Sequence, residues 1–266
     1  MSKTNYLENK ILDHIMGITA YTMPTGLWLS AFITAPSEGS GGTEAAGGSF
    51  ARVDVTGKFS ASSGGASANT EEISFPTATA NWGEIFSVGI FDAASGGNLL
   101  RYMPLTTPEG DPTSVVVHTG ETITFAAGNL TFAETNSGKT DYLKDKMLDH
   151  MLGIASYTKP TVWLAAFYGI PGVNESAEEI NSHGYARMAL ADLLSAANNG
   201  VVTNGSEEVS FPVTVGGSWG EISSVATFDA SSGGNMLRVS PLSSPVLIGE
   251  NQYLLFPVSA LSFAED

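Results

Sequence analysis

Residues 82–98 read WGEIFSVGIFDAASGGN, and residues 219–235 read WGEISSVATFDASSGGN. In both stretches an apolar run ends at an Asp, and a loop with two successive glycines and an Asn follows. Glycine supplies the positive φ that tight turns need, and Asp can accept hydrogen bonds from its own loop. A phosphate-binding loop would also need a helix N-terminus and a lysine, and neither is expected here. The pattern therefore predicts a β-hairpin, and the chain contains it twice.

The similarity continues outward from this hairpin over the whole chain, so the sequence is a tandem repeat. It predicts two homologous domains, residues 1–135 and 138–266, joined by a short polar linker. Because so short a linker leaves little freedom, we expect the domains to dock against each other as a pseudo-dimer. The matched segments include 10–14 with 146–150, 27–29 with 162–164, 50–52 with 185–187, 71–76 with 207–212, and 130–134 with 261–265.

Each repeat opens with a predicted amphipathic helix. In the first repeat Leu7, Ile11 and Ile15 recur near one face, a pattern that fits packing on the same domain and insertion into a neighbour. Thr4 is the expected N-cap, and Gly17 is the expected stop. The second repeat has the equivalent residues Thr140, Leu143, Met147, Met151 and Gly153.

The rest of each repeat consists of short apolar or alternating segments separated by turns rich in Gly, Ser and Asn. Several short strands at this spacing favour an antiparallel β-sandwich. We therefore expect a mainly β protein with two homologous antiparallel β-sandwich domains, each with a short N-terminal α-helix. The order of the strands does not follow from the sequence.

Charge and composition exclude several partners. The 266-residue chain has 27 acidic and 11 basic residues, a net charge of −16, and no cysteine. Nucleic acids and anionic membrane surfaces are bound by clustered Lys and Arg, so we expect neither as a partner. No apolar run is long enough to span a membrane. Without cysteine, disulfides, thiolate catalysis and cysteine-ligated zinc are excluded.

All four arginines recur in pairs, Arg52 with Arg187 and Arg101 with Arg238. Arginine forms bidentate pairs with carboxylates, and we favour salt bridges within each domain over contacts at an interface. Candidate partners are Glu71, Glu72, Glu84 and their copies in the second repeat.

The four tryptophans also recur in pairs. Trp28 and Trp163 lie within apolar runs and are expected in the core, whereas Trp82 and Trp219 follow polar loops. The core is favoured for the second pair too, but stacking on a sugar, as in carbohydrate-binding modules, stays open. The candidate interface residues are thus Arg52, Arg187, Arg101, Arg238, Trp82, Trp219, Leu7, Ile11 and Ile15.

Signals for catalysis and metal binding are weak. The chain has no Gly-x-Ser-x-Gly nucleophile motif, and neither predicted helix has two His four residues apart. His14 and His150 fall near helix ends, where the helix dipole favours a cation. A glycosidase-like pair of carboxylates stays open because acids are abundant. We expect no enzyme activity, no catalytic residue, no metal and no cofactor.

Five motifs mark the first repeat: LENKILDH at 7–14, ISFP at 73–76, NWG at 81–83, GIFDAASGGNLL at 89–100 and FAAGNLTF at 125–132. Together they resemble the small β-domains of tailed-bacteriophage virion proteins that are often described as tail fibre or minor structural proteins. The second repeat departs from the pattern at residues 226–228 and 256–258. The resemblance implies a virion structural protein that is made in the host cytoplasm, and it brings no catalytic residues with it.

Within that family we favour a capsid decoration (cement) protein on the particle exterior. The chain has no coiled coil or long shaft, a duplicated domain could bridge two similar capsid environments, and acidity keeps the protein off packaged DNA. The expected partner is the major capsid protein or another virion protein, and self-association is also open. The alternatives are a tail fibre or collar-attached protein, with or without host-glycan binding, and a glycosidase.

Overall fold

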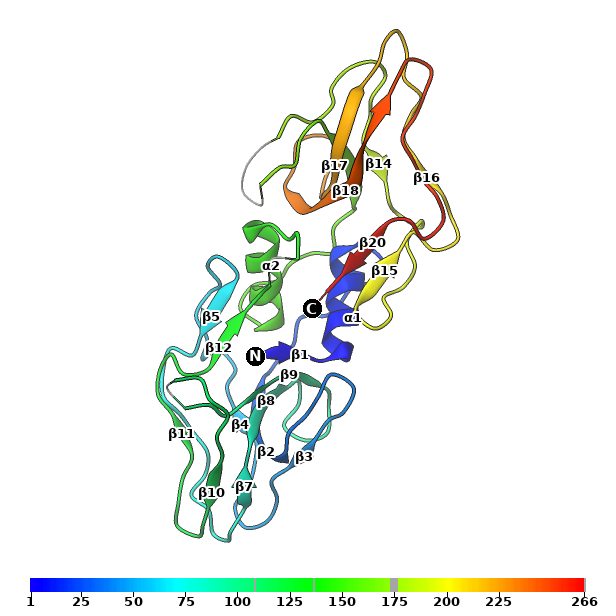
Figure 1. Cartoon of the computed structure of the whole chain (residues 1–266). Helices are drawn as coiled ribbons and strands as arrows, with labels where there is room; N and C mark the ends of the chain where they lie inside the picture. The colour runs from blue at the N-terminus through cyan, green and yellow to red at the C-terminus, as the bar shows by residue number, and fades with distance from the viewer. Residues whose placement is uncertain (108, 136, 173–176, 266) are drawn as a thin grey trace.

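The computed structural model describes residues 1–107, 109–135, 137–172 and 177–265. The protein is mainly β, with two 11-residue helices and antiparallel sheets. Repeat 1 (residues 1–135) and repeat 2 (residues 138–266) extend to opposite ends of the molecule, and the helices lie between them (Figure 1). The expected fold class is confirmed, since each of the two repeated segments combines a helix with antiparallel strands.

In repeat 1 a short strand and a helix come first along the chain. The helix α1 spans Asn5–Ile15. The strands are β1 (Ser2–Lys3), β2 (Trp28–Thr34), β3 (Thr43–Glu44), β4 (Val53–Asp54), β5 (Ala66–Ala68), β6 (Ile73–Ser74), β7 (Gly83–Ile85), β8 (Ser87–Phe91), β9 (Leu99–Pro104), β10 (Val115–Val117), β11 (Thr124–Phe125) and β12 (Thr131–Ala133).

Repeat 2 has fewer but longer strands. The helix α2 spans Asp141–Met151. The strands are β13 (Trp163–Phe167), β14 (Met188–Ala189), β15 (Val201–Thr203), β16 (Val209–Ser210), β17 (Gly220–Phe228), β18 (Met236–Ile248), β19 (Leu255–Phe256) and β20 (Ser262–Ala264).

The core of repeat 1 lies between a sheet and a long two-stranded ribbon. The sheet has the order β1-β9-β8-β2-β3, with β4 also paired to β2. In the ribbon, residues 66–85 run antiparallel to residues 115–133 through the short ladders β5–β12, β6–β11 and β7–β10. Apolar side chains from both layers are buried, among them Leu29 and Ile90 of the sheet and Ile73 and Phe132 of the ribbon.

The predicted hairpin is confirmed in both repeats, because β8 pairs antiparallel with β9 and β17 with β18. The repeats differ just after it. Residues 105–114 separate β9 from β10, whereas β18 runs without a break through the equivalent region. The shorter connection in repeat 2 accounts for the fall in residue offset between the repeats, from 137 at Asn98 and Asn235 to 131 at Phe125 and Phe256.

The helix ends follow the expected capping chemistry. The Thr4 side chain accepts a hydrogen bond from the Leu7 N–H, and Gly17 has a φ of +74°. The Gly17 N–H donates to His14 O and the Ile18 N–H to Asp13 O, which is the Schellman pattern. The second helix repeats these features at Thr140 and residues 153–154.

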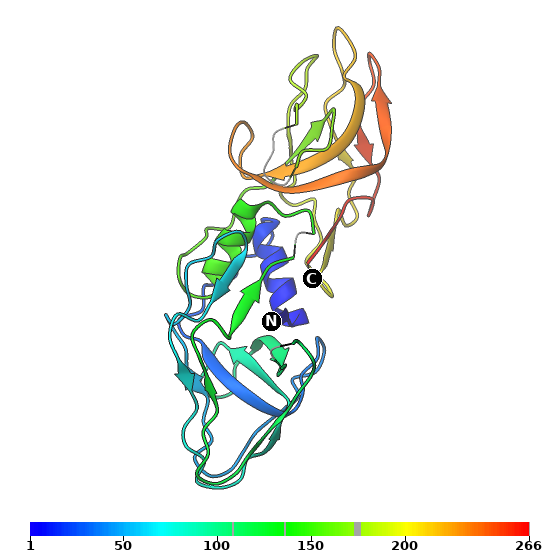
Figure 2. The same cartoon turned by 60° about the vertical axis from the view of Figure 1, so that its left-hand side comes forward.

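The helices bring the two repeats together at the centre of the molecule (Figure 2). Helix α1 contacts β9 of its own repeat and β15 of repeat 2, and α2 contacts β18 and β5 in the same way. One continuous cluster of buried apolar residues runs through both repeats. Neither helix is long and apolar enough to cross a membrane.

Candidate functional site at the contact between the repeats

Acidic and amide side chains of each helix accept hydrogen bonds from backbone N–H groups of the other repeat. Asp13 Oδ1 accepts from the Ala197 N–H at 2.7 Å, and Asp149 Oδ1 accepts from the Ser62 N–H at 2.7 Å. A second pair of contacts joins Asn9 to Gly200 at 2.8 Å and Asp145 to Gly65 at 2.7 Å. Because each contact recurs with the repeats exchanged, the interface has the form of a two-fold symmetric dimer within one chain.

His14 and His150 meet at the centre of this contact, with ring centroids 5.0 Å apart. His14 Nε2 lies 3.0 Å from Tyr157 O, and its Nδ1 accepts the Tyr21 N–H at 3.0 Å. His150 makes the mirrored contacts, with Nε2 2.9 Å from Tyr21 O and Nδ1 accepting the Tyr157 N–H. Each ring therefore bridges its own repeat and the other.

This geometry requires neutral histidine rings. A nitrogen that accepts an N–H carries no proton, so the other nitrogen must be the donor to the carbonyl. Burial, and next the neighbouring His150 ring, lower the pKa of His14 to about 4. The expectation that these histidines are cations at the helix ends is therefore wrong for His14, because the closed interface excludes the water that would solvate the charge.

A buried cluster of charges also joins the two repeats, through lysines that precede the helices. Lys139 Nζ lies 3.1 Å from Glu134 and 2.5 Å from Glu265, and Lys3 Nζ lies 2.9 and 3.0 Å from the same two carboxylates. Each carboxylate thus contacts a lysine from both repeats. Arg101 pairs with Glu134, and Arg238 pairs with Glu265.

The cations keep the two carboxylates ionised. Burial alone would raise the pKa of Glu134, but Arg101, Lys3 and Lys139 more than offset this and hold it well below its usual range. For Glu265, Lys139 and Lys3 likewise outweigh burial and lower the pKa. Breaking a buried ion pair leaves an uncompensated charge, so this cluster ties the two repeats to each other.

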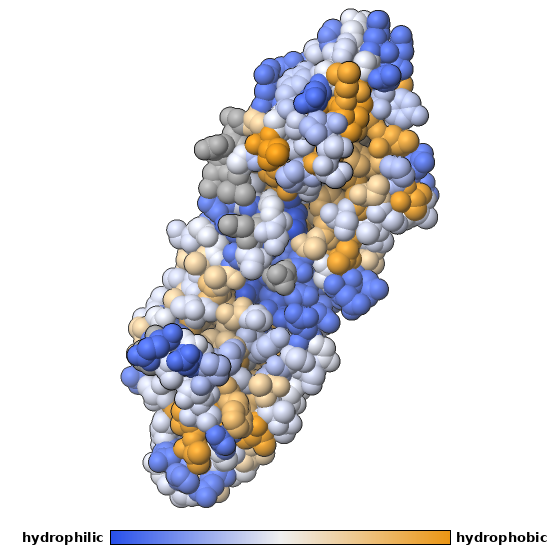
Figure 3. Space-filling model, in the orientation of Figure 1, coloured by the Kyte–Doolittle hydropathy of each residue, from blue (hydrophilic) through white to orange (hydrophobic). Residues whose placement is uncertain are grey.

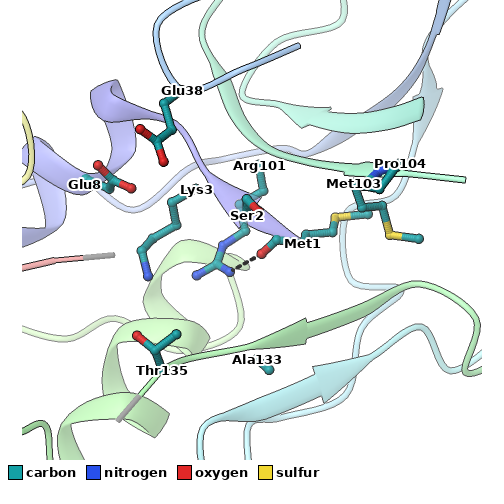
Figure 4. Close-up of a pocket in the computed structure, with 10 residues that line it drawn as sticks. All are labelled: Met1, Ser2, Lys3, Glu8, Glu38, Arg101, Met103, Pro104, Ala133 and Thr135. Atoms are coloured by element: carbon teal, nitrogen blue, oxygen red, sulfur yellow. Dashed lines mark hydrogen bonds between the residues drawn. The ribbon is translucent and has the colours of Figure 1, made fainter. Parts of the chain in front are cut away.

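A cavity of about 380 Å³ lies next to the cluster (Figure 4). Lys3 of β1 and Arg101 of β9 lie side by side at it, and the Arg101 Nη1 donates to Met1 O at 3.1 Å. Both side-chain cations at the cavity are already paired with Glu134. Within the described ranges, no group of three or more His, Cys, Asp or Glu is arranged to hold a metal ion.

Arg52 and Arg187 have a different role from Arg101 and Arg238. The Arg52 guanidinium pairs with both carboxylate oxygens of Glu44 at 2.8 and 2.6 Å and stacks on Phe91, 3.3 Å from the ring centroid. Its Nη1 also donates to the carbonyls of Ala93 and Gly96, and so fixes the hairpin loop. Arg187 repeats this arrangement with Glu179, Phe228, Ala230 and Gly233.

The arginines pair within their own repeats, but the candidate partners are wrong. Glu71 instead contacts Lys58 at 3.0 Å on the surface. The true partners Glu44 and Glu179 lie on segments next to β2 and β13, where sheet pairing brings them beside the arginines.

The buried cluster of lysines and glutamates had a signal in the sequence that the prediction of site residues missed. Lys-Thr recurs at 3–4 and 139–140, and Phe-Ala-Glu recurs at 132–134 and 263–265.

Trp82 and Trp219 lie in the core, as favoured, and the expectation of a core position is wrong for Trp28 and Trp163. Trp82 and Trp219 are 3% and 1% exposed, packed against aromatic rings, whereas Trp28 and Trp163 are half-buried. The polar residues before Trp82 and Trp219 belong to loops, and they do not indicate that the indole rings that follow them are exposed. Stacking of either buried ring on a sugar therefore loses its structural basis.

The helical candidates Leu7, Ile11 and Ile15 are all buried, at 3% exposure or less. Ile11 and Ile15 border the narrow space between the helices together with Met147 and Met151. These side chains thus form the contact between the repeats. A role for the nine candidate residues at a contact with another virion protein stays a prediction.

Comparison with known proteins identifies a family. The family model described as "Podophage GP4 fiber I protein gp80" matches the chain twice, over residues 2–133 and over residues 138–264. The two matches coincide with the two repeats, and the resemblance to phage virion proteins is confirmed. A search of curated proteins found no match.

Proposed function

The chain belongs to the family of the podophage GP4 fiber I protein gp80, and we propose that it is a non-enzymatic structural component of a fibre on the phage particle. A location in the virion, and association with other virion proteins, follow from the family. The match over both repeats is the observation that carries the proposal. It favours a fibre over the capsid decoration protein that the sequence alone had favoured.

The contact between the repeats supports a mechanical role. Reciprocal hydrogen bonds, the buried charge cluster and a shared apolar core fix the relative orientation of the two lobes. A segment whose halves cannot swing independently transmits position from one end of a fibre to the other. The docked pair would thus act as a stiff spacer about the length of two repeats.

Copy number on the purified particle tests this proposal. We would quantify the protein by mass spectrometry against the major capsid protein and locate it by gold labelling in electron micrographs. A fibre component is expected at a few to a few tens of copies, with label on the fibres. Hundreds of copies with label spread over the head would overturn the fibre assignment in favour of decoration.

A further inference from the structure

The two repeats present different loops at the opposite ends of the molecule (Figure 1). In repeat 1 these distal loops are residues 77–81 and 118–122, and in repeat 2 they are residues 213–218 and 249–253. The backbone match between them is close: the Ala78 N–H donates to Glu121 O, and the Thr214 N–H donates to Gln252 O, both at 2.8 Å. The backbones are therefore alike at residues 77–79 and 213–215, although repeat 2 has one more residue before its tryptophan.

Three exposed threonines of repeat 1 are replaced by hydrophobic residues in repeat 2. Thr77 and Thr79, on either side of Ala78, correspond to Val213 and Val215, on either side of Thr214. Thr122 corresponds to Tyr253. Val213, Val215 and Tyr253 are 48%, 68% and 48% exposed. In repeat 1, by contrast, the Thr77 and Thr122 hydroxyls hydrogen-bond to each other at 3.0 Å.

The three hydrophobic residues lie close together. Residues 211–214 run beside residues 252–254, which brings Val213 next to Tyr253. The Val215 N–H donates to His183 O, so the loop at 183–184 adjoins the same surface. Leu247, 70% exposed, precedes the turn that leads to Tyr253. Figure 3 shows hydrophobic groups at this end of the molecule and also at the opposite, repeat 1 end.

Charge at this end selects the kind of partner. The sequence has no Lys or Arg between 188 and 237 or after 238, whereas Glu221 is opposite Leu247 and Glu250 lies in the adjoining turn. A second copy of the same surface would bring acid against acid. A partner with an apolar centre and a basic rim would bury the hydrophobic side chains and complement the charge.

We propose that the distal surface formed by Val213, Val215, Leu247 and Tyr253 is the attachment surface of this protein, and that it binds an apolar, basic-rimmed surface of another virion protein. This assignment rests on the proposed function as a fibre component. The two ends differ at Val213, Val215 and Tyr253, which have threonines as counterparts in repeat 1. Leu247 has an exposed apolar counterpart there, Val116, so the three substituted positions assign the attachment to repeat 2.

Transplanting the repeat 1 residues tests the assignment. The triple variant Val213→Thr, Val215→Thr, Tyr253→Thr should fold, because the same framework carries threonines in repeat 1. Particles would be produced from phage lacking the gene, complemented with either form, and copies per particle measured. A few side chains near the centre of an interface carry most of its binding energy, so removing three at once is expected to cause at least a ~10-fold loss of incorporation.

The matched control is Phe86→Ser, which removes a 40% exposed apolar side chain from repeat 1 and introduces the residue at the equivalent position 223. It is expected to incorporate like the wild type. Melting curves check that every variant is folded, and Val215→Thr alone replaces the triple variant if that variant does not fold. Incorporation of the wild type should weaken at high salt, as expected for a basic partner.

Three results would overturn the inference. The folded distal variant could incorporate like the wild type, both variants could lose incorporation equally, or the distal variant could incorporate normally but lose adsorption to host cells, which would make the surface host-facing. Failure of the proposed function is distinct, since then the wild-type protein itself would be found at head-lattice copy numbers or not on the particle.

Discussion

The carboxylate of Glu134 contacts cations from both repeats, so its removal measures what the buried charges contribute. Glu134→Gln keeps the shape but leaves Lys3, Arg101 and Lys139 short of one negative charge. Breaking a buried pair in this way costs about 3–5 kcal/mol of unfolding free energy. Chemical denaturation would measure the loss.

A surface pair provides the control for this substitution. Glu71 is paired with Lys58 and its side chain is 59% exposed. Glu71→Gln is expected to cost no more than about 1 kcal/mol, because water screens and replaces the interaction. Equal losses for the two variants would show that the central cluster is not energetically distinct.

The histidine pair predicts how stability depends on pH. The folded-state pKa of His14 is about 4, below the ordinary 6.5, so the unfolded chain binds a proton first as the pH falls. The contribution of neutral His14 to the unfolding free energy is therefore complete above about pH 6.5, and it declines as the pH falls from 6.5 to 4. The lowered pKa of Glu134 and Glu265 adds a further decline at lower pH, below their ordinary 4.5.

Proton NMR of the folded protein would check the histidine prediction directly. The His14 ring signal should titrate near pH 4, while unfolding free energies decrease over the window above it. His118→Gln changes an exposed histidine and should leave that part of the stability curve unchanged. A His14 ring that titrates near 6.5 in the folded state would contradict the closed geometry.

Among the elements, the helix ends combine a local and a long-range constraint. Gly17 has a φ of +74°, and a Cβ there would lie 2.8 Å from Pro160 O of the other repeat. Gly17→Ala therefore strains the backbone, at about 1–2 kcal/mol, and also pushes on the interface. Gly57→Ala, at φ +72° with no atom within 4 Å of the added carbon, isolates the backbone cost. Denaturation should show a larger loss for Gly17→Ala, and equal losses would exclude a contact effect.

Local sequence signals predicted the elements that depend on neighbours in the chain. Thr4, Gly17 and the Asp-Gly-Gly-Asn loops act within a few residues, so the caps and hairpins could be read directly. The partners of the arginines could not, because sheet pairing brings Arg52 to Glu44, and Arg101 to Glu134 across the fold. The polar context of Trp82 likewise described its loop and not its buried ring.

The exchange of helix contacts between repeats also lay beyond the sequence pattern. Leu7, Ile11 and Ile15 give the apolar face, but the pattern fits either packing partner. The signal that decides the matter is the recurrence of Asp13 and Asp149 with identical roles, each accepting an N–H from the opposite repeat. Such reciprocity becomes visible only when both copies are placed in space.

At the scale of the whole molecule, the shared core predicts that both repeats unfold together. One apolar cluster and the central charges extend across the contact, so opening one repeat exposes the buried face of the other. Calorimetry of the wild type should therefore give a single transition with equal calorimetric and van't Hoff enthalpies.

Two variants test this coupling. Ile15→Asp, at a helix position 1% exposed between the repeats, should uncouple them and split or broaden the transition. Arg52→Ala removes contacts within repeat 1 alone, and it should lower the melting temperature while the transition stays single. Two resolved transitions in the wild type would mean that the repeats are independent domains, and the stiff spacer would lose its physical basis.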